Sequence, residues 1–394
     1  MVPSEEKKMI FSRLKKLAKE YGSSKMKKIM MLFVIVLSLQ NNIYAGNKKL
    51  LQTTLKPGIL VGESFISKSI FLESKRLGRV HNIVRGDLDA APGAEIGITW
   101  DTCDQNGGAI FCNDDGEIIS TVIFSSRAMN STIIDVEKDG ICEFLSGGSW
   151  SRKVLLLNHN GTPEWIFSSK RGVNGLGYAD IDGDGKLEFA LSFNGGGGVR
   201  LLESNGELIW KSDDSNAWHI EMADTNQDGN LEIISSNSRG SIKIRDKEGN
   251  ILSDVRPEIY FNKFTISPWP SSKDREYIIT SRKDEKVYVM DFGGKTIAKY
   301  NAPKTIKTLN ICAAPIRLTK DKPQYFAVLI KLLASWRRSI LYLYDDKGNI
   351  AYQEIIPDIC ESICVIDADK SGSQKILIGG TGKVWQYEYR GNSE

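Results

Sequence analysis

The chain has 394 residues, with 52 Lys and Arg against 49 Asp and Glu, so its formal net charge is only +3 at pH 7. Nine of the basic residues and three of the acidic ones fall within residues 1–45, and the rest of the chain carries a net charge of −3. This near balance gives no sign of a nucleic-acid-binding surface. The length alone would allow two or three domains, but an internal repeat predicts a single closed unit.

The N-terminal segment over 26–45 has the order of a secretory signal peptide. A basic start at Met26 is followed by an apolar run over 29–39 and by a small residue, Ala45, at the expected cleavage position. The run is too short to cross a bilayer as a stable helix, so no membrane span is expected after cleavage. A short membrane anchor with a cytoplasmic basic helix is the alternative.

The remaining boundaries follow from this assignment. Residues 1–25 are either a mis-assigned start, with translation beginning at Met26, or a leader extension. Residues 46–64 are predicted to be an N-terminal linker, and 65–394 the folded domain.

The acidic turn over 180–188 is the most informative segment of the chain. Carboxylates at positions 1, 3 and 5, a Gly at position 6, the carbonyl of position 7 and a carboxylate at position 9 offer the hard oxygen ligands that suit Ca²⁺. The predicted ligands are Asp180, Asp182, Asp184, Lys186 through its carbonyl, and Glu188. A strand follows the turn where the helical version of such a loop would continue as a helix. The alternative is that the Asp side chains only cap the turn through their own backbone.

Further copies of this turn occur along the chain. Two offer a full ligand set, each taking position 7 through its carbonyl: Asp224, Asn226, Asp228, Asn230 and Glu232; and Asp135, Glu137, Asp139, Ile141 and Glu143. A looser copy keeps Asp87, Asp89 and Glu95 but has Ala91 where a ligand belongs. An eroded copy has Lys375 in place of the closing carboxylate, which predicts a bare turn. The pattern predicts about three structural Ca²⁺ ions.

These turns mark a repeat of 44 to 48 residues, measured between Glu95, Glu143, Glu188 and Glu232. Continuing at a similar spacing to Glu276, Gln324 and Lys375 gives seven units. Each unit is predicted to hold four strands, which in the third unit fall at 173–180, 188–193, 199–203 and 207–212. Repeated four-stranded units of this length predict an all-β, seven-bladed β-propeller with antiparallel blades.

The Asp-x-Asp-x-Asp-Gly-x-x-Glu turns resemble those of FG-GAP/VCBS-type repeat propellers, the group that includes the integrin α-chain head. The resemblance covers about 65–390 and implies calcium-binding blade turns without specifying an activity. The Gly-x-x-x-Trp turns at Gly161–Trp165 and Gly206–Trp210 also resemble those of quinoprotein-type propellers. Their Trp side chains are expected to anchor one blade against the next.

A propeller must close its ring, and the β-rich segment over 65–72 has no unit of its own. We expect it to complete the last blade beside the strand over 384–389, because pairing the two would remove an exposed sheet edge.

Six Cys follow the predicted cleavage point. Cys103 and Cys112 flank one hairpin and are a candidate pair, with buried free thiols as the alternative. Cys360 and Cys364 are predicted to lie on one strand, about 13 Å apart at roughly 3.3 Å per residue, so they cannot bond to each other.

The ligand-binding surface is predicted on the end of the propeller opposite the acidic turns, where the B–C and D–A loops gather. Aromatic and cationic side chains on loops of a rigid scaffold are typical of recognition surfaces. The candidates are Trp150, Arg152, Trp218, His219, Trp336 and Arg337. The alternative is that the Trp side chains pack between blades and the Arg side chains are ordinary solvated charges. His81 and His219 are expected to enter the central channel.

The sequence therefore predicts an exported protein, periplasmic or extracellular, that binds an envelope or extracellular protein or polysaccharide. No catalytic residues are identified, and the glycine run over 195–198 precedes a strand, so it is not a phosphate loop. The alternatives are a propeller enzyme, polysaccharide lyase-like or quinoprotein-like, and a structural subunit of an envelope complex. The oligomeric state is left open.

Overall fold

The computed structural model describes most of the chain from residue 58 onward. The described ranges are 58–61, 65–86, 88, 94–102, 106–124, 130–147, 152–213, 216–237, 240–259, 261, 263–269, 275–282, 286–301, 308–319, 324–332, 337–368 and 372–390. The chain divides into two units, Met1–Lys56 and Pro57–Glu394. The predicted leader, the signal peptide over 26–45 and most of the linker lie outside the described residues. Within the described part, no helix is both long and apolar enough to cross a membrane.

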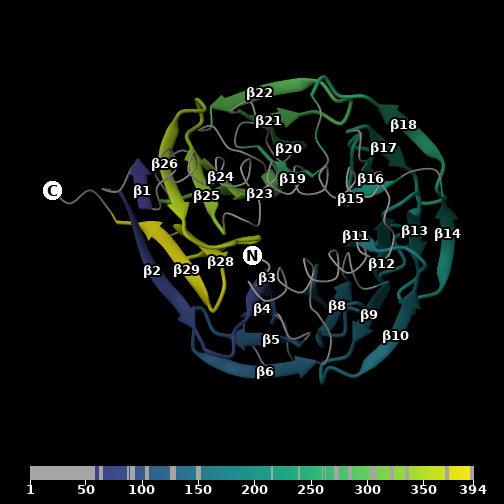
Figure 1. Cartoon of the computed structure of the whole chain (residues 1–394), viewed down its shortest axis with the longest axis horizontal. Helices are drawn as coiled ribbons and strands as arrows, with labels where there is room; N and C mark the ends of the chain where they lie inside the picture. The colour runs from purple at the N-terminus through teal and green to yellow at the C-terminus, as the bar shows by residue number, and fades with distance from the viewer. Residues whose placement is uncertain are drawn as a thin grey trace, which may run out of the picture. The chain divides into compact units, whose positions relative to one another are not determined.

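Pro57–Glu394 forms seven antiparallel sheets that follow one another round a ring in chain order (Figure 1). The first four blades are β3 (Arg79–Gly86), β4 (Glu95–Asp101), β5 (Gly107–Cys112) and β6 (Ile118–Phe124); β7 (Thr132–Ile134), β8 (Glu143–Gly147), β9 (Lys153–Leu157) and β10 (Pro163–Ser168); β11 (Val173–Ala179), β12 (Glu188–Phe193), β13 (Gly198–Leu202) and β14 (Leu208–Ser212); β15 (Ala217–Ala223), β16 (Glu232–Asn237), β17 (Ile242–Arg245) and β18 (Ile251–Val255).

The remaining three blades include both ends of the described chain. They are β19 (Thr265–Pro268), β20 (Glu276–Arg282), β21 (Lys286–Met290) and β22 (Thr296–Asn301); β23 (Thr308–Ile316), β24 (Tyr325–Leu332), β25 (Ser339–Tyr344), β26 (Ile350–Ile356) and β1 (Gly58–Val61); β27 (Ser362–Asp367), β28 (Gln374–Gly379), β29 (Lys383–Tyr389) and β2 (Ile66–Glu73). The predicted seven-bladed, all-β fold is confirmed, and its strand bounds in the third blade agree with prediction to within one residue.

Burial follows each strand's position in its blade. The second strands, such as β4 and β12, are buried at every residue, because both faces of an inner strand pack against neighbouring blades. The outermost strands, such as β14 and β18, leave most of their side chains partly or fully exposed. The core lies between blades: Leu145 and Leu156 of the second blade pack with Phe189 and Leu191 of the third.

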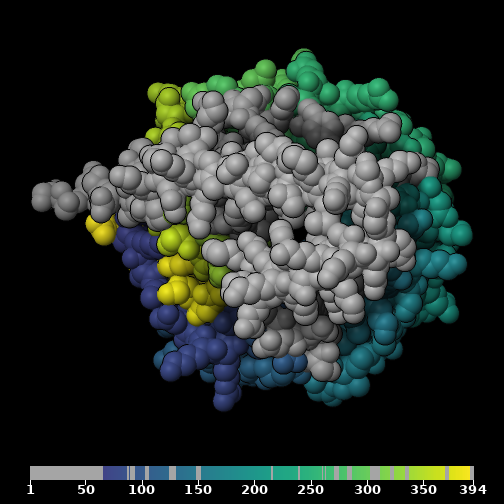
Figure 2. Space-filling view, viewed as in Figure 1, coloured from purple at the N-terminus to yellow at the C-terminus, as the bar shows by residue number. Residues whose placement is uncertain are grey.

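The N-terminal strand β2 closes the ring, as predicted. It pairs antiparallel with β29, from Ile66 opposite Tyr389 to Glu73 opposite Lys383. In Figure 1 the two strands lie side by side, and Figure 2 shows the purple N-terminal strands beside the yellow C-terminal ones. One part of the predicted linker differs from the prediction. Gly58–Val61 forms β1, which pairs with β26 as a fifth strand of the sixth blade. This pairing covers an edge that would otherwise stay open.

Two Trp side chains join successive blades, as expected from their turns. Trp165 Nε1 donates to Ser204 O at 2.9 Å, and Trp210 Nε1 donates to Lys247 O at 2.7 Å. Each ring lies flat against a glycine of the next blade's turn: a Cβ on Gly206 would come within 2.7 Å of the Trp165 ring, and one on Gly249 within 2.8 Å of Trp210. Both glycines also have positive φ. Only glycine meets both requirements.

We predict that Gly206→Ala lowers the free energy of unfolding by about 2–4 kcal/mol, since it combines positive-φ strain with displacement of Trp165. Gly196→Ala is the matched control, because Gly196 has φ +78° and nothing within 4 Å of its added Cβ. It should cost about 1 kcal/mol from backbone strain alone. Denaturant titration of both variants measures the difference, and equal losses would show that the Trp165 contact contributes nothing.

Candidate functional site

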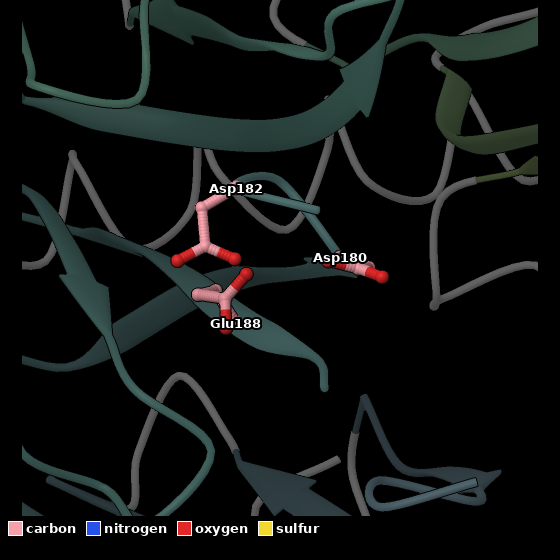
Figure 3. A group of neighbouring side chains, drawn as sticks. All are labelled: Asp180, Asp182 and Glu188. Atoms are coloured by element: carbon pink, nitrogen blue, oxygen red, sulfur yellow. The ribbon is translucent and has the colours of Figure 1, made fainter. Parts of the chain in front are cut away.

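The acidic turn of the third blade brings three carboxylates together between β11 and β12 (Figure 3). Asp180, Asp182 and Glu188 each offer an oxygen within 4.8 Å of the other two. The backbone bends sharply to allow this: Gly183 and Gly185 both have positive φ, and their N–H groups donate to Asp180 at 2.8 and 3.1 Å. The turn thus concentrates negative charge at one point.

Glu188 is the buried member of this group. Its side chain is 1 % exposed, and its Oε2 accepts a hydrogen bond from Ile181 N at 2.9 Å. Its Oε1 is buried with no hydrogen-bond partner among the described residues. Burial, followed by the charges of Asp182 and Asp184, raises the pKa of Glu188 to about 7. In Figure 3 the carboxylates of Glu188 and Asp182 face each other. An unsatisfied buried oxygen beside two further carboxylates fits a divalent cation, which binds through hard oxygen ligands.

Asp184, a predicted ligand, and Lys138, from the neighbouring turn, make other contacts around this group. Asp184 lies outside the group of three, and its carboxylate accepts a hydrogen bond from Lys186 N at 2.8 Å. Lys138, from the turn of the preceding blade, forms an ion pair with Asp180 at 2.9 Å, and this contact holds the pKa of Asp180 below its usual value. The turn therefore already attracts one positive charge.

The position-9 glutamates make the same bond in four successive blades. Each accepts a hydrogen bond from the backbone N–H seven residues earlier: Glu95 from Leu88, Glu143 from Val136, Glu188 from Ile181 and Glu232 from Thr225, at 2.8 to 2.9 Å. All four glutamates are buried. This repeated bond ties the turn to the start of the second strand and shows that the four turns share one design.

The turns of the second and fourth blades are held by their own Asp and Asn side chains. Asp135 accepts from Asp139 N and Gly140 N, and Asp139 accepts from Ile141 N. In the fourth blade the corresponding acceptors are Asp224, Asn226 and Asp228, with Asn230 among the donors. Glu137 and Ile141 are exposed. Among the described residues, only the third turn brings three carboxylates within 4.8 Å, and Asp87 and Asp89 lie outside those residues.

The turn of the seventh blade, which the sequence predicted to be bare, has Lys375 where the first four blades have a glutamate. Lys375 is buried, its Nζ donates to Asp114 O at 3.1 Å and lies 5.7 Å from the centre of the Phe71 ring. Its ammonium group thus contacts the first blade instead of leaving room for a cation.

The predicted ligand-binding residues are only partly described. Arg152 and Arg337 are exposed, and Trp218 at the start of β15 is 37 % exposed. Trp150 and Trp336 lie outside the described residues. Cys112 carries a buried free thiol, and Cys103, its candidate partner, also lies outside them.

His81 and His219 enter a cavity of about 330 Å³ in the central channel, here called the channel cavity. Most of its lining comes from the beginnings of the innermost strands, which is the end of the channel away from the acidic turns. The lining residues include Arg79, Asn82, Ser131, Thr132, Asn174, Tyr178, Lys263, Lys331 and Glu361. Every blade contributes at least one of them.

Two networks of ionisable groups surround this cavity. In the first, Glu361 bridges Lys331 and His81, and the second ring nitrogen of His81 lies 3.0 Å from Asp101 Oδ1, out of line for a hydrogen bond. In the second, His219 Nε2 lies 2.9 Å from Glu221 Oε1, and its Nδ1 lies 3.5 Å from Lys263 Nζ.

Both lysines are held in surroundings that disfavour their charge. Burial lowers the pKa of Lys263 to about 8. Burial, followed by the charges of Arg79 and Lys263, lowers the pKa of Lys331 to about 8 as well. Burial therefore disfavours the charge of both lysines, and the neighbouring cations Arg79 and Lys263 disfavour that of Lys331 further.

We predict that Lys263→Met stabilises the fold at pH 7 by on the order of 1–2 kcal/mol, since one pKa unit corresponds to about 1.4 kcal/mol. Below pH 8 this lysine is protonated both folded and unfolded, so its burial penalty is fully present; the penalty shrinks as pH rises from about 8 toward 10.5. The advantage of the variant should shrink likewise. Lys211→Met, at a side chain 61 % exposed, is the control and should change stability by less than about 0.5 kcal/mol. Denaturant titration at several pH values measures both, and an advantage that persists above pH 10.5 would contradict the assignment.

Sequence reasoning placed the two histidines in the channel but missed Arg79, Lys263, Lys331 and Glu361. Each lies near the channel-facing end of a strand in a different blade, so no local motif joins them. The repeat itself could have indicated two of them, because Arg79 begins β3 and Lys263 precedes β19, close to the positions that His81 and His219 take as the third residues of β3 and β15.

Comparisons with known proteins identify the fold only. No protein-family model matches the chain, and no curated protein matches it. Among solved structures, the WD40 domain of Neurospora crassa Pan2 matches with a TM-score of 0.52 and 11 % identity, covering 86 % of this chain and 99 % of that one. BBS1N in complex with ARL6DN, soaked with lead, matches with a TM-score of 0.57 and 8 % identity, covering 85 % of this chain and 99 % of that one. At these identities the likeness establishes that the chain has a β-propeller fold, and no more.

Proposed function

We propose that this chain is an exported, calcium-stabilised interaction module of the FG-GAP/VCBS type. Its acidic turns bind structural Ca²⁺, and the opposite end of the propeller binds a partner. The observation that carries the calcium part is the cluster of Asp180, Asp182 and Glu188, in which a buried Glu188 oxygen has no partner among the described residues. Equivalent ions are proposed in the second and fourth blades, on the ligand sets Asp135–Glu143 and Asp224–Glu232.

Calcium titration by calorimetry tests this part. Glu188→Gln keeps an oxygen for Ile181 N but removes the charge, so it should abolish one binding event and leave the others. Glu207→Gln removes an exposed carboxylate from the neighbouring turn of the same blade and should change nothing. Absence of any calcium binding by the full chain, or an equal effect of both variants, would rule the site out.

The partner is proposed to be a protein of the envelope or extracellular space. Support comes from the exposed Trp218, Arg152 and Arg337 on the end of the propeller away from the acidic turns, and from the propeller fold itself. The structural neighbour BBS1N was solved in complex with ARL6DN, which is a property of that protein. Affinity capture from envelope extract should recover a partner with the wild-type chain and lose it with Trp218→Ala. If the Trp218→Ala variant still recovered the partner, the interface would not include Trp218.

A propeller enzyme, polysaccharide lyase-like, is the second candidate. It is favoured by one observation: the channel cavity gathers Arg79, His81, His219, Lys331 and Glu361 at one place. Elimination from a uronate polymer would need a cation to neutralise the carboxylate, a base to remove the proton on the neighbouring carbon, and an acid to protonate the oxygen that leaves as the glycosidic bond breaks. Incubation with acidic polysaccharides, followed by absorbance of the conjugated double bond, would detect it. No absorbance change with any acidic polymer would leave the binding module as the function.

A further inference from the structure

The channel cavity has a lining that matches a ligand of definite chemistry. We propose that it binds a small polar anion, the size of a monosaccharide acid, that carries a carboxylate or phosphate group. This site is separate from the acidic turns and from the exposed surface around Trp218, and it requires neither calcium nor a protein partner.

Charge is the first support for this assignment. The lining residues include three cations, Arg79, Lys263 and Lys331, and one carboxylate, Glu361, while Asp101 and Glu221 lie outside the lining against His81 and His219. Glu361 is already engaged by Lys331. Lys263 contacts the carbonyl oxygen of Asn174 at 3.2 Å and a nitrogen of His219 at 3.5 Å, and no described carboxylate lies within ion-pair distance of it. An anion entering the cavity would pair directly with Lys263, which Glu221 stabilises only at longer range.

Unsatisfied donors are the second support, and they are independent of the charge count. Arg79 Nε and Ser131 Oγ are both buried and have no hydrogen-bond partner among the described residues. Ser131 is 3 % exposed, and both residues line the channel cavity. Buried polar groups are nearly always hydrogen-bonded in folded proteins. Both atoms are shielded from water-sized molecules, so an acceptor-rich group such as a carboxylate or phosphate would reach either of them after a side-chain rotation.

The size and the remaining lining indicate the rest of the ligand. A cavity of about 330 Å³ lies at the lower end of the range for small-molecule sites, about 300–1,000 Å³, which suits a ligand of about monosaccharide size. Asn82, Thr132 and Asn174 provide amide and hydroxyl groups on several sides. Such groups pair well with ligand hydroxyls. A hydroxylated acid, either a sugar acid or a sugar phosphate, meets all three requirements.

The test is calorimetric titration of the full chain at neutral pH and low salt with three probes of similar size: glucuronate, glucose 6-phosphate and uncharged glucose. At least one acid should bind and glucose should not, and which acid binds more tightly identifies the anionic group. Lys263→Met should weaken acid binding by about tenfold or more, equivalent to at least 1.4 kcal/mol. Since the same substitution is expected to stabilise the fold, its loss of binding cannot be attributed to unfolding.

Lys211→Met is the matched control, because it removes the same charge from an exposed position outside the cavity. It should change acid affinity by less than about a factor of two. The proposal is overturned if neither acid binds at millimolar concentration. It is also overturned if glucose binds as tightly as the acids, or if Lys211→Met and Lys263→Met weaken binding equally.

Discussion

Removing calcium with excess chelator will lower the melting temperature of the full chain by roughly 10 °C. A ligand that binds only the folded state at about 100 times its Kd stabilises by about 2.7 kcal/mol, so three occupied turns contribute about 8 kcal/mol. For the roughly 330 residues of the propeller, the entropy of unfolding converts this free energy into a shift of that size. Differential scanning calorimetry with and without chelator measures it.

In this experiment Asp182→Asn distinguishes the stabilisation that comes from the metal from the stabilisation that comes from the turn's own hydrogen bonds. The amide keeps an oxygen in the place of Asp182 Oδ1, which accepts a hydrogen bond from Asp184 N at 3.0 Å, but it removes the negative charge. The variant should therefore lose about a third of the chelator response while its melting temperature in chelator stays close to that of the wild-type chain. Equal melting curves with and without chelator in the wild-type chain would refute a structural role for calcium.

Ile66→Ala will lower the free energy of unfolding by about 2–5 kcal/mol, the usual range for truncating a buried Ile. Ile66 is 1 % exposed on β2, the strand that closes the ring, and packs in a cluster with Ile376, Tyr387 and Leu329. Because the N-terminal strand contributes to the last blade, the loss should appear in the global unfolding transition rather than as local fraying.

Ile70→Ala on the same strand is the control. Ile70 is 52 % exposed and pairs with the same partner strand, opposite Trp385. It should lose less than about 0.5 kcal/mol, the usual effect of a surface substitution. Urea unfolding of both variants gives the comparison. If Ile66→Ala and Ile70→Ala were equally mild, β2 would not be part of the cooperative fold.

The sequence predicted the parts of the fold that repeat. The spacing of the position-9 glutamates located the blades, and the alternation of apolar residues between turns located the strands. Closure of the ring by the segment over 65–72 could also be predicted. A β-rich segment with no unit of its own at one end of the chain is expected to pair with the unpaired sheet edge at the other end. β1 could not be predicted in this way, since Gly58–Val61 is an extra fifth strand that stands outside the repeat.

The candidate sites also differ in how far they could be predicted from sequence. The convergence of Asp180, Asp182 and Glu188 follows from their spacing within one turn, so it was readable from sequence. The position of the Asp184 carboxylate could not be predicted. Its side-chain rotamer decides whether it joins the other carboxylates or accepts a hydrogen bond from Lys186 N. The channel cavity was readable only in part: Arg79, Lys263 and Lys331 come from three blades, and only the closed ring brings them together.

Anomalous X-ray scattering from crystals grown in calcium is the most direct test of the structural role assigned to the acidic turns. We predict a peak among Asp180, Asp182 and Glu188, equivalent peaks in the turns that end at Glu143 and Glu232, and none beside Lys375. A third-blade turn with no peak at saturating calcium, with Asp180 still paired to Lys138, would contradict it.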